Sequence, residues 1–214
     1  MGTISIKIIE SDKVIKGRII KAMVEELNNL FKRSTGSILT EIKKLTERLL
    51  EGTPEILSLQ GGKLQGAFGI RKGEEGSATF AIVKSIAESI VIEHIVIDAA
   101  KSGGKIRGGM KIYIQPSNFG NLLSLSEGYT VFGKGGSKSI PWLRWLLTLG
   151  DKILIGDYHF EPSSGGRSTL GTMLPPGVFR VPPSYSGTED DNFITRAFEK
   201  KEKEIARAIN KGLR

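Results

Sequence analysis

The chain has 214 residues, a formal net charge of +8 at pH 7, no cysteine and two histidines, His94 and His159. Without cysteine, the sequence excludes disulfides, thiolate metal sites and a cysteine nucleophile. Two histidines also exclude a metal site built from three histidines of one chain. The apolar fraction is typical of a globular protein, and a chain of this length can bury a core in one domain without a disulfide or a metal.

Charge and hydropathy also bear on the cellular compartment. No stretch approaches the roughly 18 apolar residues of a membrane span, and Lys7, Glu10 and Asp12 come too early for an apolar secretory segment. The start departs from the myristoylation pattern, because Ile6 stands where a serine or threonine is required. We therefore expect a protein that is intracellular when made and is not exported. Its basic surplus permits contact with nucleic acid or acidic partners without demonstrating it.

The N-terminal third of the chain predicts two amphipathic helices. The segment Ser34-Thr35-Gly36 predicts a break or kink between them, and the second helix extends to Gly52. Pro54 then favours the start of a further helical turn, and another helix is expected over 78–89. The first helix is indicated by apolar residues at helical spacing, namely Ile15, Ile19, Met23, Leu27 and Leu30.

The middle of the chain has β-like patterns. Residues 90–98 (IVIEHIVID) form a strand candidate, and residues 110–115 alternate between apolar and polar side chains. Residues 99–109 between them are rich in glycine and contain no acidic residue. This arrangement predicts a hairpin with a long loop.

The C-terminal third combines one compact apolar helix with short strands. Pro141 opens this helix and Gly150 closes it, and its apolar residues surround almost the whole circumference, which indicates burial on more than one side. The final helix is apolar at both ends and charged in its middle. The other expected elements are a strand over 152–160, a loop over 165–177, a strand over 178–181 and this final helix over 192–211.

These elements predict an α+β fold in which a small antiparallel β-sheet is flanked by amphipathic N-terminal helices and a long C-terminal helix. No repeat, low-complexity tract or linker divides the sequence. We therefore expect a single domain over 1–214. Within it, a helical part covers about 1–75, and a part with the sheet and the C-terminal helix covers about 76–214.

One segment resembles a phosphate-binding loop. Residues 128–135 (GYTVFGKG) match its first seven positions, but Gly135 stands where a magnesium-binding hydroxyl is needed. The interior is bulky and β-forming, and no helix follows at once to supply a dipole. The pattern therefore favours a strand that leads into a turn.

Asp157 and His159 lie two residues apart, on one face of the expected strand. Such a pair can serve a metal or act as a general base. No other residue nominates a nucleophile or a third ligand, so the pattern favours a sheet histidine that is hydrogen-bonded to a neighbour. We expect no enzymatic activity, no cofactor and no metal, and an enzyme that uses this pair is kept only as a third hypothesis.

The glycine-rich loop offers a candidate contact to DNA. Four basic residues, Lys101, Lys105, Arg107 and Lys111, occur between residues 99 and 111 without an acid. Their binding to a phosphate backbone would be independent of base sequence and sensitive to salt. Because no aromatic residues are interleaved, stacking on single-stranded bases is not expected. A solvated loop that carries charge for solubility is the alternative.

Two further segments have the character of subunit contacts. Trp142 and Trp145 lie three residues apart on one helix face, where paired tryptophans are either interface anchors or, as the default, core residues. Residues 177–188 form a strand and turn that two prolines stiffen, which lowers the entropy cost of a contact.

The order of these segments resembles the tail-completion or neck proteins of tailed bacteriophages, the minor tail component family of lambdoid type. The resemblance covers most of the chain and is clearest beyond residue 75. It is carried by a turn over 62–69 (GKLQGAFG), 114–119 (IQPSNF) with 122–125 (LLSL), 140–147 (IPWLRWLL), 157–159 (DYH), 179–183 (FRVPP), 187–188 (GT) and 191–197 (DNFITRA).

The resemblance implies a structural virion protein without enzymatic activity. Such a protein assembles with copies of itself as a ring, expected to be a hexamer, at the head-to-tail junction. Its expected partners are other neck and tail proteins, such as the connector and the tail terminator, and DNA in the lumen. Its expected location is the virion, and the host cytoplasm during assembly. The residues expected at the subunit interface are Trp142, Trp145, Phe179, Arg180, Asn192, Phe193 and Arg196.

Two questions stay open at the level of the sequence. Tail completion, tail termination and head-side connection share one architecture, so the pattern does not separate them. The alternative function is a sequence-independent DNA-binding protein, which the basic stretches at 13–21 and 99–111 favour.

Overall fold

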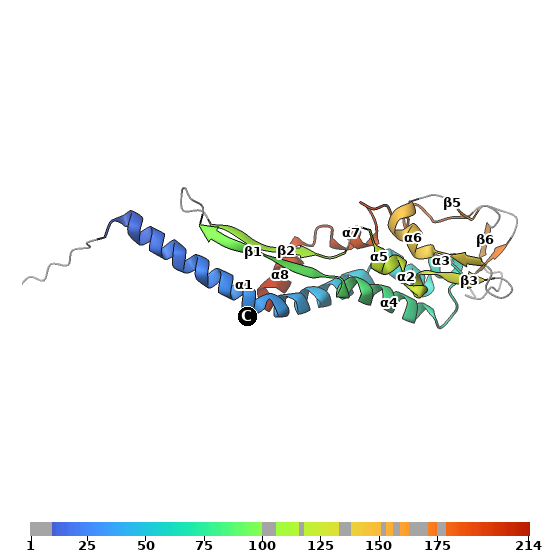
Figure 1. Cartoon of the computed structure of the whole chain (residues 1–214). Helices are drawn as coiled ribbons and strands as arrows, with labels where there is room; N and C mark the ends of the chain where they lie inside the picture. The colour runs from blue at the N-terminus through green and yellow to red at the C-terminus, as the bar shows by residue number, and fades with distance from the viewer. Residues whose placement is uncertain are drawn as a thin grey trace, which may run out of the picture.

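The computed structural model describes residues 10–99, 106–115, 118–132, 138–150, 153–155, 159–162, 171–174 and 179–214. The molecule is elongated (Figure 1). A 40-residue helix, α1 (Asp12–Glu51), extends from a globular end, and a β-hairpin lies along part of it. The hairpin consists of β1 (Val91–Ala99) and β2 (Ile106–Tyr113), which pair antiparallel.

Helix α1 is continuous, so the predicted break at residues 34–36 is wrong. Thr35 donates its hydroxyl to the carbonyl oxygen of Phe31 at 2.7 Å, which satisfies this group within the helix. Ser34 and Ile38 are buried on the packed face. A glycine inside a helix costs only about 1 kcal/mol relative to alanine, and the packing on both sides of Gly36 offsets this cost.

The globular end is built around the helices that follow α1. The ring of Phe68 stacks on that of Trp142, with centroids 5.5 Å apart and an interplanar angle of 20°. Both side chains are 0% exposed. The helices of this end are α2 (Pro54–Gly61), α3 (Lys63–Ala67), α4 (Glu75–Glu88), α5 (Gly120–Leu123), the 3₁₀ turn η1 (Ser126–Gly128), and α6 (Trp142–Arg144) with the π-helical segment η3 (Trp145–Leu149).

The strands beyond the hairpin are short and also pair antiparallel. In the described part of the chain each forms a two-stranded ladder, so the expected sheet is divided into separate pairs. The loop predicted over 165–177 is wrong where β7 forms, and the loop over 99–109 is wrong where β2 begins. The three further pairs are β3 (Thr130–Phe132) with β4 (Lys138–Ile140), β5 (Ile153–Ile155) with β8 (Phe179–Arg180), and β6 (His159–Pro162) with β7 (Gly171–Leu174).

The predicted C-terminal helix is interrupted and forms α7 (Phe193–Phe198) and α8 (Glu202–Gly212). Between them Lys200 has φ of 60°, a left-handed conformation that an α-helix does not contain. The break lets α7 pack in the globular end while α8 returns to α1. The contact between α8 and α1 is close, because a Cβ on Gly212 would lie 2.5 Å from Cα of Ile38.

Two hydrophobic cores hold these elements together. The larger core fills the globular end, and the smaller one lies between α1, the hairpin and α8, around Ile38, Ile42 and Ile90. Ile114, which follows β2, packs against both. The fold is α+β with a long N-terminal helix, as the sequence predicts. In the described residues no helix is long and apolar enough to cross a membrane.

Candidate subunit interface

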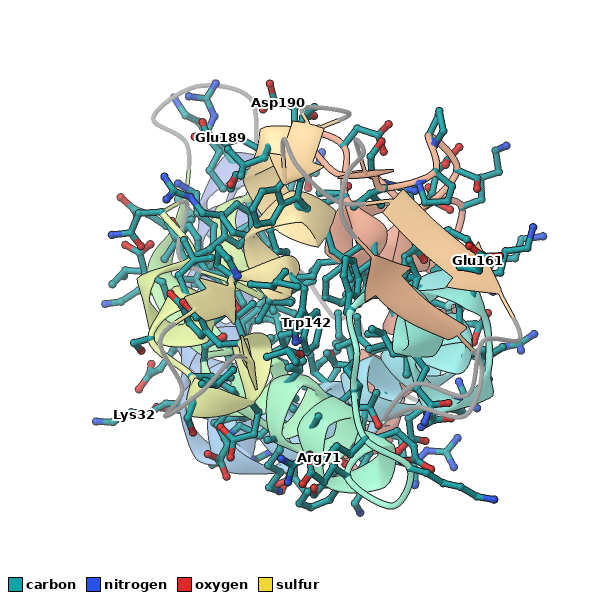
Figure 2. The ribbon with its side chains drawn as sticks, turned by 90° about the vertical axis from the view of Figure 1, so that its right-hand side faces the viewer. Lys32, Arg71, Trp142, Glu161, Glu189 and Asp190 are labelled. Atoms are coloured by element: carbon teal, nitrogen blue, oxygen red, sulfur yellow. The ribbon has the colours of Figure 1, made fainter. Side chains whose placement is uncertain are left out.

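The two tryptophans predicted as interface anchors lie in the core of the globular end. Trp142 is 0% exposed and Trp145 is 7% exposed. The Nε1 atoms of both are buried, without a hydrogen-bond partner among the residues that the structure describes. Figure 2 views this end along the molecule and places Trp142 near its middle. In the single chain, this pair therefore stabilises the core.

Asn192 and Phe193 are also buried, with 0% and 1% of their surfaces exposed. Asn192 caps α7, because its side-chain oxygen accepts from the amides of Ile194 at 3.0 Å and Thr195 at 3.3 Å. The Thr195 hydroxyl accepts in turn from the Asn192 amide at 2.9 Å, which completes a capping box. The sequence match at this position thus corresponds to a helix start within the subunit.

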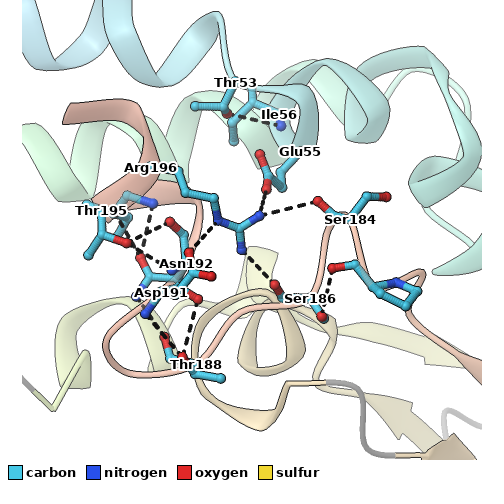
Figure 3. A network of polar contacts seen from close by, with 12 residues as sticks. Thr53, Glu55, Ile56, Ser184, Ser186, Thr188, Asp191, Asn192, Thr195 and Arg196 are labelled. Carbon is cyan, nitrogen blue, oxygen red and sulfur yellow. Dashed lines mark hydrogen bonds and ion pairs between the residues drawn. The ribbon is translucent and has the colours of Figure 1, made fainter. Parts of the chain in front are cut away.

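Arg196 joins three segments of the same chain (Figure 3). Its Nη1 donates to Glu55 Oε1 at 2.8 Å and its Nη2 to the carbonyl oxygen of Ser186 at 2.6 Å. Its Nε lies 2.9 Å from Asp191 Oδ1. The Glu55 side chain is only 3% exposed, and its burial raises its pKa, while the Arg196 charge opposes this shift. Arg196 therefore fixes α7 and the turn before it against α2.

The other predicted residues are placed less completely. Phe179 and Arg180 form β8, which pairs with β5. Arg107 and Lys111 are exposed on β2, whereas Lys101 and Lys105 lie outside the described residues. Of the two predicted basic stretches, the first (13–21) lies in α1, and only part of the second can be placed.

The two motifs with only a weak signal for chemistry, the pair of Asp157 and His159 and residues 128–135, are also only partly described. His159 begins β6, and its proposed partner Asp157 lies outside the described residues. Thr130–Phe132 is a strand, as expected for the segment that resembles a phosphate-binding loop, and residues 133–137 lie outside the described part. Where the chain is described, no group of three histidine, aspartate or glutamate side chains could hold a metal ion.

The first half of α1 has an apolar face that the described residues leave exposed. We call residues 12–33 the arm, and none of them is buried. On this face Ile19 is 53% exposed and Met23 49%, and Val14, on the other side of the helix, is 45% exposed. Beside them the arm is basic. Its first turns carry Lys13, Lys16, Arg18 and Lys21, against Asp12.

The hairpin covers a different face of the arm. The Asn28 side chain donates to the carbonyl oxygen of Ile97 at 2.9 Å and accepts from its amide at 2.8 Å, so one side chain satisfies the strand edge. Phe31 contacts His94 edge to face, with ring centroids 6.3 Å apart. The hairpin is thus fixed to α1, while its outer face exposes Val91 and Tyr113.

The sequence pattern contains a signal for this second face. The apolar residues predicted as one stripe divide between two faces, with Ile19 and Met23 half-exposed and Leu27 closer to the hairpin side. Ile19 and Met23 are each followed by a second apolar residue, Ile20 and Val24. Neighbouring residues are about 100° apart on a helix, so such pairs indicate an apolar arc wider than one packing face.

A second exposed apolar surface lies at the globular end, around a cavity of about 380 Å³. Tyr129 is 41% exposed and Val131 51%, and both line the cavity with Trp142 at its base. Phe80, 66% exposed, lies one helical turn beyond the lining residue Ser77. We call this surface the Tyr129 cavity.

A third feature is a groove of about 470 Å³ between α1 and α8. Four basic side chains and two carboxylates line it, and hydrogen bonds from lysines lower the pKa values of both carboxyl groups. Lys211 lies 2.7 Å from Glu41, and Arg48 lies 2.9 Å from Glu204. The four basic residues are Lys44, Arg48, Arg207 and Lys211.

Comparison with known proteins found no matching family model, no matching curated protein and no matching solved structure.

Proposed function

We propose that this protein is a structural subunit of a tailed-phage virion, which acts in the neck at the head-to-tail junction as one copy in a homo-oligomeric ring. The resemblance of residues beyond about 75 to tail-completion proteins supports the assignment to the virion. A hexamer is the copy number that the resemblance implies. Other neck and tail proteins are the proposed partners above and below the ring.

The observation that carries this proposal is the uncovered arm. In proteins, most of the stability of a helix comes from packing of its apolar face rather than from intrinsic propensity. The hairpin covers one face, yet Ile19 and Met23, one helical turn apart, stay about half exposed on another. An extended element with a free apolar face is well suited to binding a neighbouring subunit.

The proposal is tested by the mass of the purified chain and by its position in the particle. We expect native mass spectrometry to find a defined oligomer, and electron microscopy of phage particles to place it at the junction of head and tail. A chain that stays monomeric at tens of micromolar and is absent from purified particles would contradict the proposal.

The alternative function, binding to the DNA backbone, is favoured by the groove between α1 and α8. Lys203, Arg207 and Lys211 are exposed on α8 at spacings of four residues, so they follow one another on one side of the helix. Lys44 and Arg48 of α1 add two more positive charges at the groove. Phosphate contacts from such a surface would not depend on base sequence.

Duplex binding measured against salt concentration tests this alternative. For a protein that contacts DNA here, replacing Lys203 and Arg207 by alanine should weaken binding equally for all sequences and reduce the salt slope by about two. Replacing the exposed Lys63 and Lys72 of the globular end by alanine provides a control of equal charge change. Binding that is undetectable near physiological salt would remove the alternative.

A further inference from the structure

The two exposed apolar surfaces lie toward opposite ends of the elongated molecule. The arm extends away from the globular end, which contains α4, α6 and β3 (Figure 1). The Tyr129 cavity is lined by residues of these elements and of the turns beside them. Since α1 is one continuous helix, the arm cannot fold back onto the cavity of its own chain. Contact between these two surfaces therefore requires a second copy.

We propose that the arm of one copy docks in the Tyr129 cavity of the next copy. This inference rests on the proposed function, in which copies of the chain assemble, and it names the surfaces that meet. The interface is heterologous, because different patches of the two copies are in contact. Repeated around an axis, an interface of this kind closes a ring when the rotation permits and otherwise forms a filament.

The cavity has the size and the lining that this partner requires. Its volume of about 380 Å³ lies in the range of about 300–1,000 Å³ that is usual for binding pockets. Tyr129 and Val131 form an apolar side, and Trp142 lies beneath with an indole N–H that has no partner among the described residues. Ile19 and Met23 lie one helical turn apart on the arm, so both side chains can insert into the cavity together.

The charges at the two surfaces are complementary. The first turns of the arm carry four basic residues, while Glu74 and Glu127 line the cavity. Arg71 also lines it and pairs with Glu74 at 3.6 Å, and on the arm Arg18 pairs with Glu10 at 2.6 Å. The charges that remain for a contact between copies are therefore Glu127 of the cavity and the lysines of the arm. Glu127 is exposed and accepts from the Ser126 hydroxyl at 2.8 Å, so its carboxylate is available to a cation from another chain.

The same charges disfavour pairing of two arms side by side in parallel. In such a pair the basic residues between positions 13 and 21 would face their own copies, and like charges at close range repel. An antiparallel pair of arms would instead be symmetric, with Ile19 close to its own copy. In that arrangement Ile19→Cys would cross-link to Ile19→Cys of the other copy. Cross-linking therefore separates an antiparallel pair of arms from docking in the Tyr129 cavity.

Disulfide cross-linking in the full chain tests the proposal, and the absence of native cysteine makes every introduced thiol unambiguous. One preparation carries Met23→Cys and the other Val131→Cys, and both positions are about half exposed in the free chain. After mixing and mild oxidation we expect a cross-linked pair that contains one copy of each variant. Ile19→Cys provides a second arm position with the same expected partner.

The matched control is Leu57→Cys on α2, which is 54% exposed but lies outside the Tyr129 cavity. It should give at least ten-fold less cross-link with either arm variant. If oligomers form but the arm cysteines link to themselves or to Leu57→Cys, docking of the arm in the Tyr129 cavity is wrong and the proposed function stands. If the unmodified chain stays monomeric at tens of micromolar, this inference fails, and if the chain is also absent from purified particles, the proposed function fails with it.

Discussion

At the scale of single residues, the pair of Glu55 and Arg196 is a largely buried ion pair, with 2.8 Å between Arg196 Nη1 and Glu55 Oε1. The glutamate side chain is 3% exposed and the arginine side chain 30% exposed. Two carbonyl oxygens also accept from the guanidinium, so Arg196 closes the turn over 184–186 onto α2. Residues that a family resemblance marks can thus serve the fold of the subunit itself.

Replacing Arg196 and replacing Glu55 should have unequal effects on the free energy of unfolding. Arg196→Met leaves a carboxylate buried without its cation, so we expect a loss of about 2 kcal/mol in the free energy of unfolding at pH 7. This is below the roughly 3–5 kcal/mol for a fully buried pair, because Arg196 is partly exposed and solvent screens its charge. Glu55→Gln keeps an acceptor for Arg196 and should cost much less. Urea unfolding of the two variants measures both values.

The pKa of Glu55 fixes the sign of the pH dependence. Burial raises this pKa above its ordinary value of 4.5, so the folded chain binds more protons than the unfolded chain in the window above pH 4.5. The contribution of Glu55 to stability is therefore greatest at low pH and declines as the pH rises through the folded pKa. Compared with Glu55→Gln, the unmodified chain should lose stability over this window. If the stability of the unmodified chain and that of Glu55→Gln changed with pH in the same way, the raised pKa of Glu55 would be contradicted.

At the scale of elements, the return of α8 to α1 depends on a small residue at the contact. A Cβ on Gly212 would lie 2.5 Å from Ile38 Cα and 2.7 Å from Ile38 N, and backbone atoms cannot move aside easily. Gly212→Ala should therefore separate α8 from α1, at a cost of about 1–3 kcal/mol. Hydrogen exchange should become faster in α8 and in the hairpin, but not in the globular end.

The same substitution at Gly36 is the matched control, because Gly36 lies inside α1 and a Cβ there would meet nothing within 4 Å. Gly36→Ala should stabilise the chain by about 0.5–1 kcal/mol, since alanine favours the helix. If Gly212→Ala stabilised the chain to the same extent, the close packing of α8 on α1 would be wrong.

The elements that the sequence predicts correctly are those whose pattern is local. The long apolar repeat identifies α1, and the alternation over 110–115 identifies the hairpin. The errors arise where distant contacts decide the outcome. Gly36 is tolerated because the helix packs on both sides of it, and Lys200 interrupts a helix whose two ends pack in different cores. No local pattern contains that information.

At the scale of the whole molecule, the candidate interface was only partly accessible from the sequence. The expected resemblance marks Trp142 and Phe193, but a resemblance in sequence does not distinguish a core residue from a contact residue, and both side chains are buried. Ile19 and Met23 are visible as apolar residues, yet their exposure follows from the position of the hairpin on the neighbouring face. The three-dimensional arrangement is needed to show which apolar face has no partner.

Assembly through this face has a direct consequence for the mass of the protein in solution. The double variant Ile19→Asp with Met23→Asp places two charges on the uncovered face without touching a buried residue. Full burial of an isoleucine or methionine contributes about 1.5–3 kcal/mol, so covering the exposed half of each contributes about 1 kcal/mol. Loss of about 2 kcal/mol per contact raises the dissociation constant by about 30-fold, and the cost of burying a carboxylate adds to this.

Analytical ultracentrifugation of the variant should therefore show a shift from oligomer to monomer at a concentration where the unmodified chain is assembled. Circular dichroism and the thermal midpoint should change little, because the exposed face does not contribute to either core. The control is Asn29→Asp, an exposed arm position next to the hairpin-binding Asn28, which adds negative charge away from the apolar face. If the double variant stayed as fully assembled as Asn29→Asp, the arm would lie outside the subunit interface.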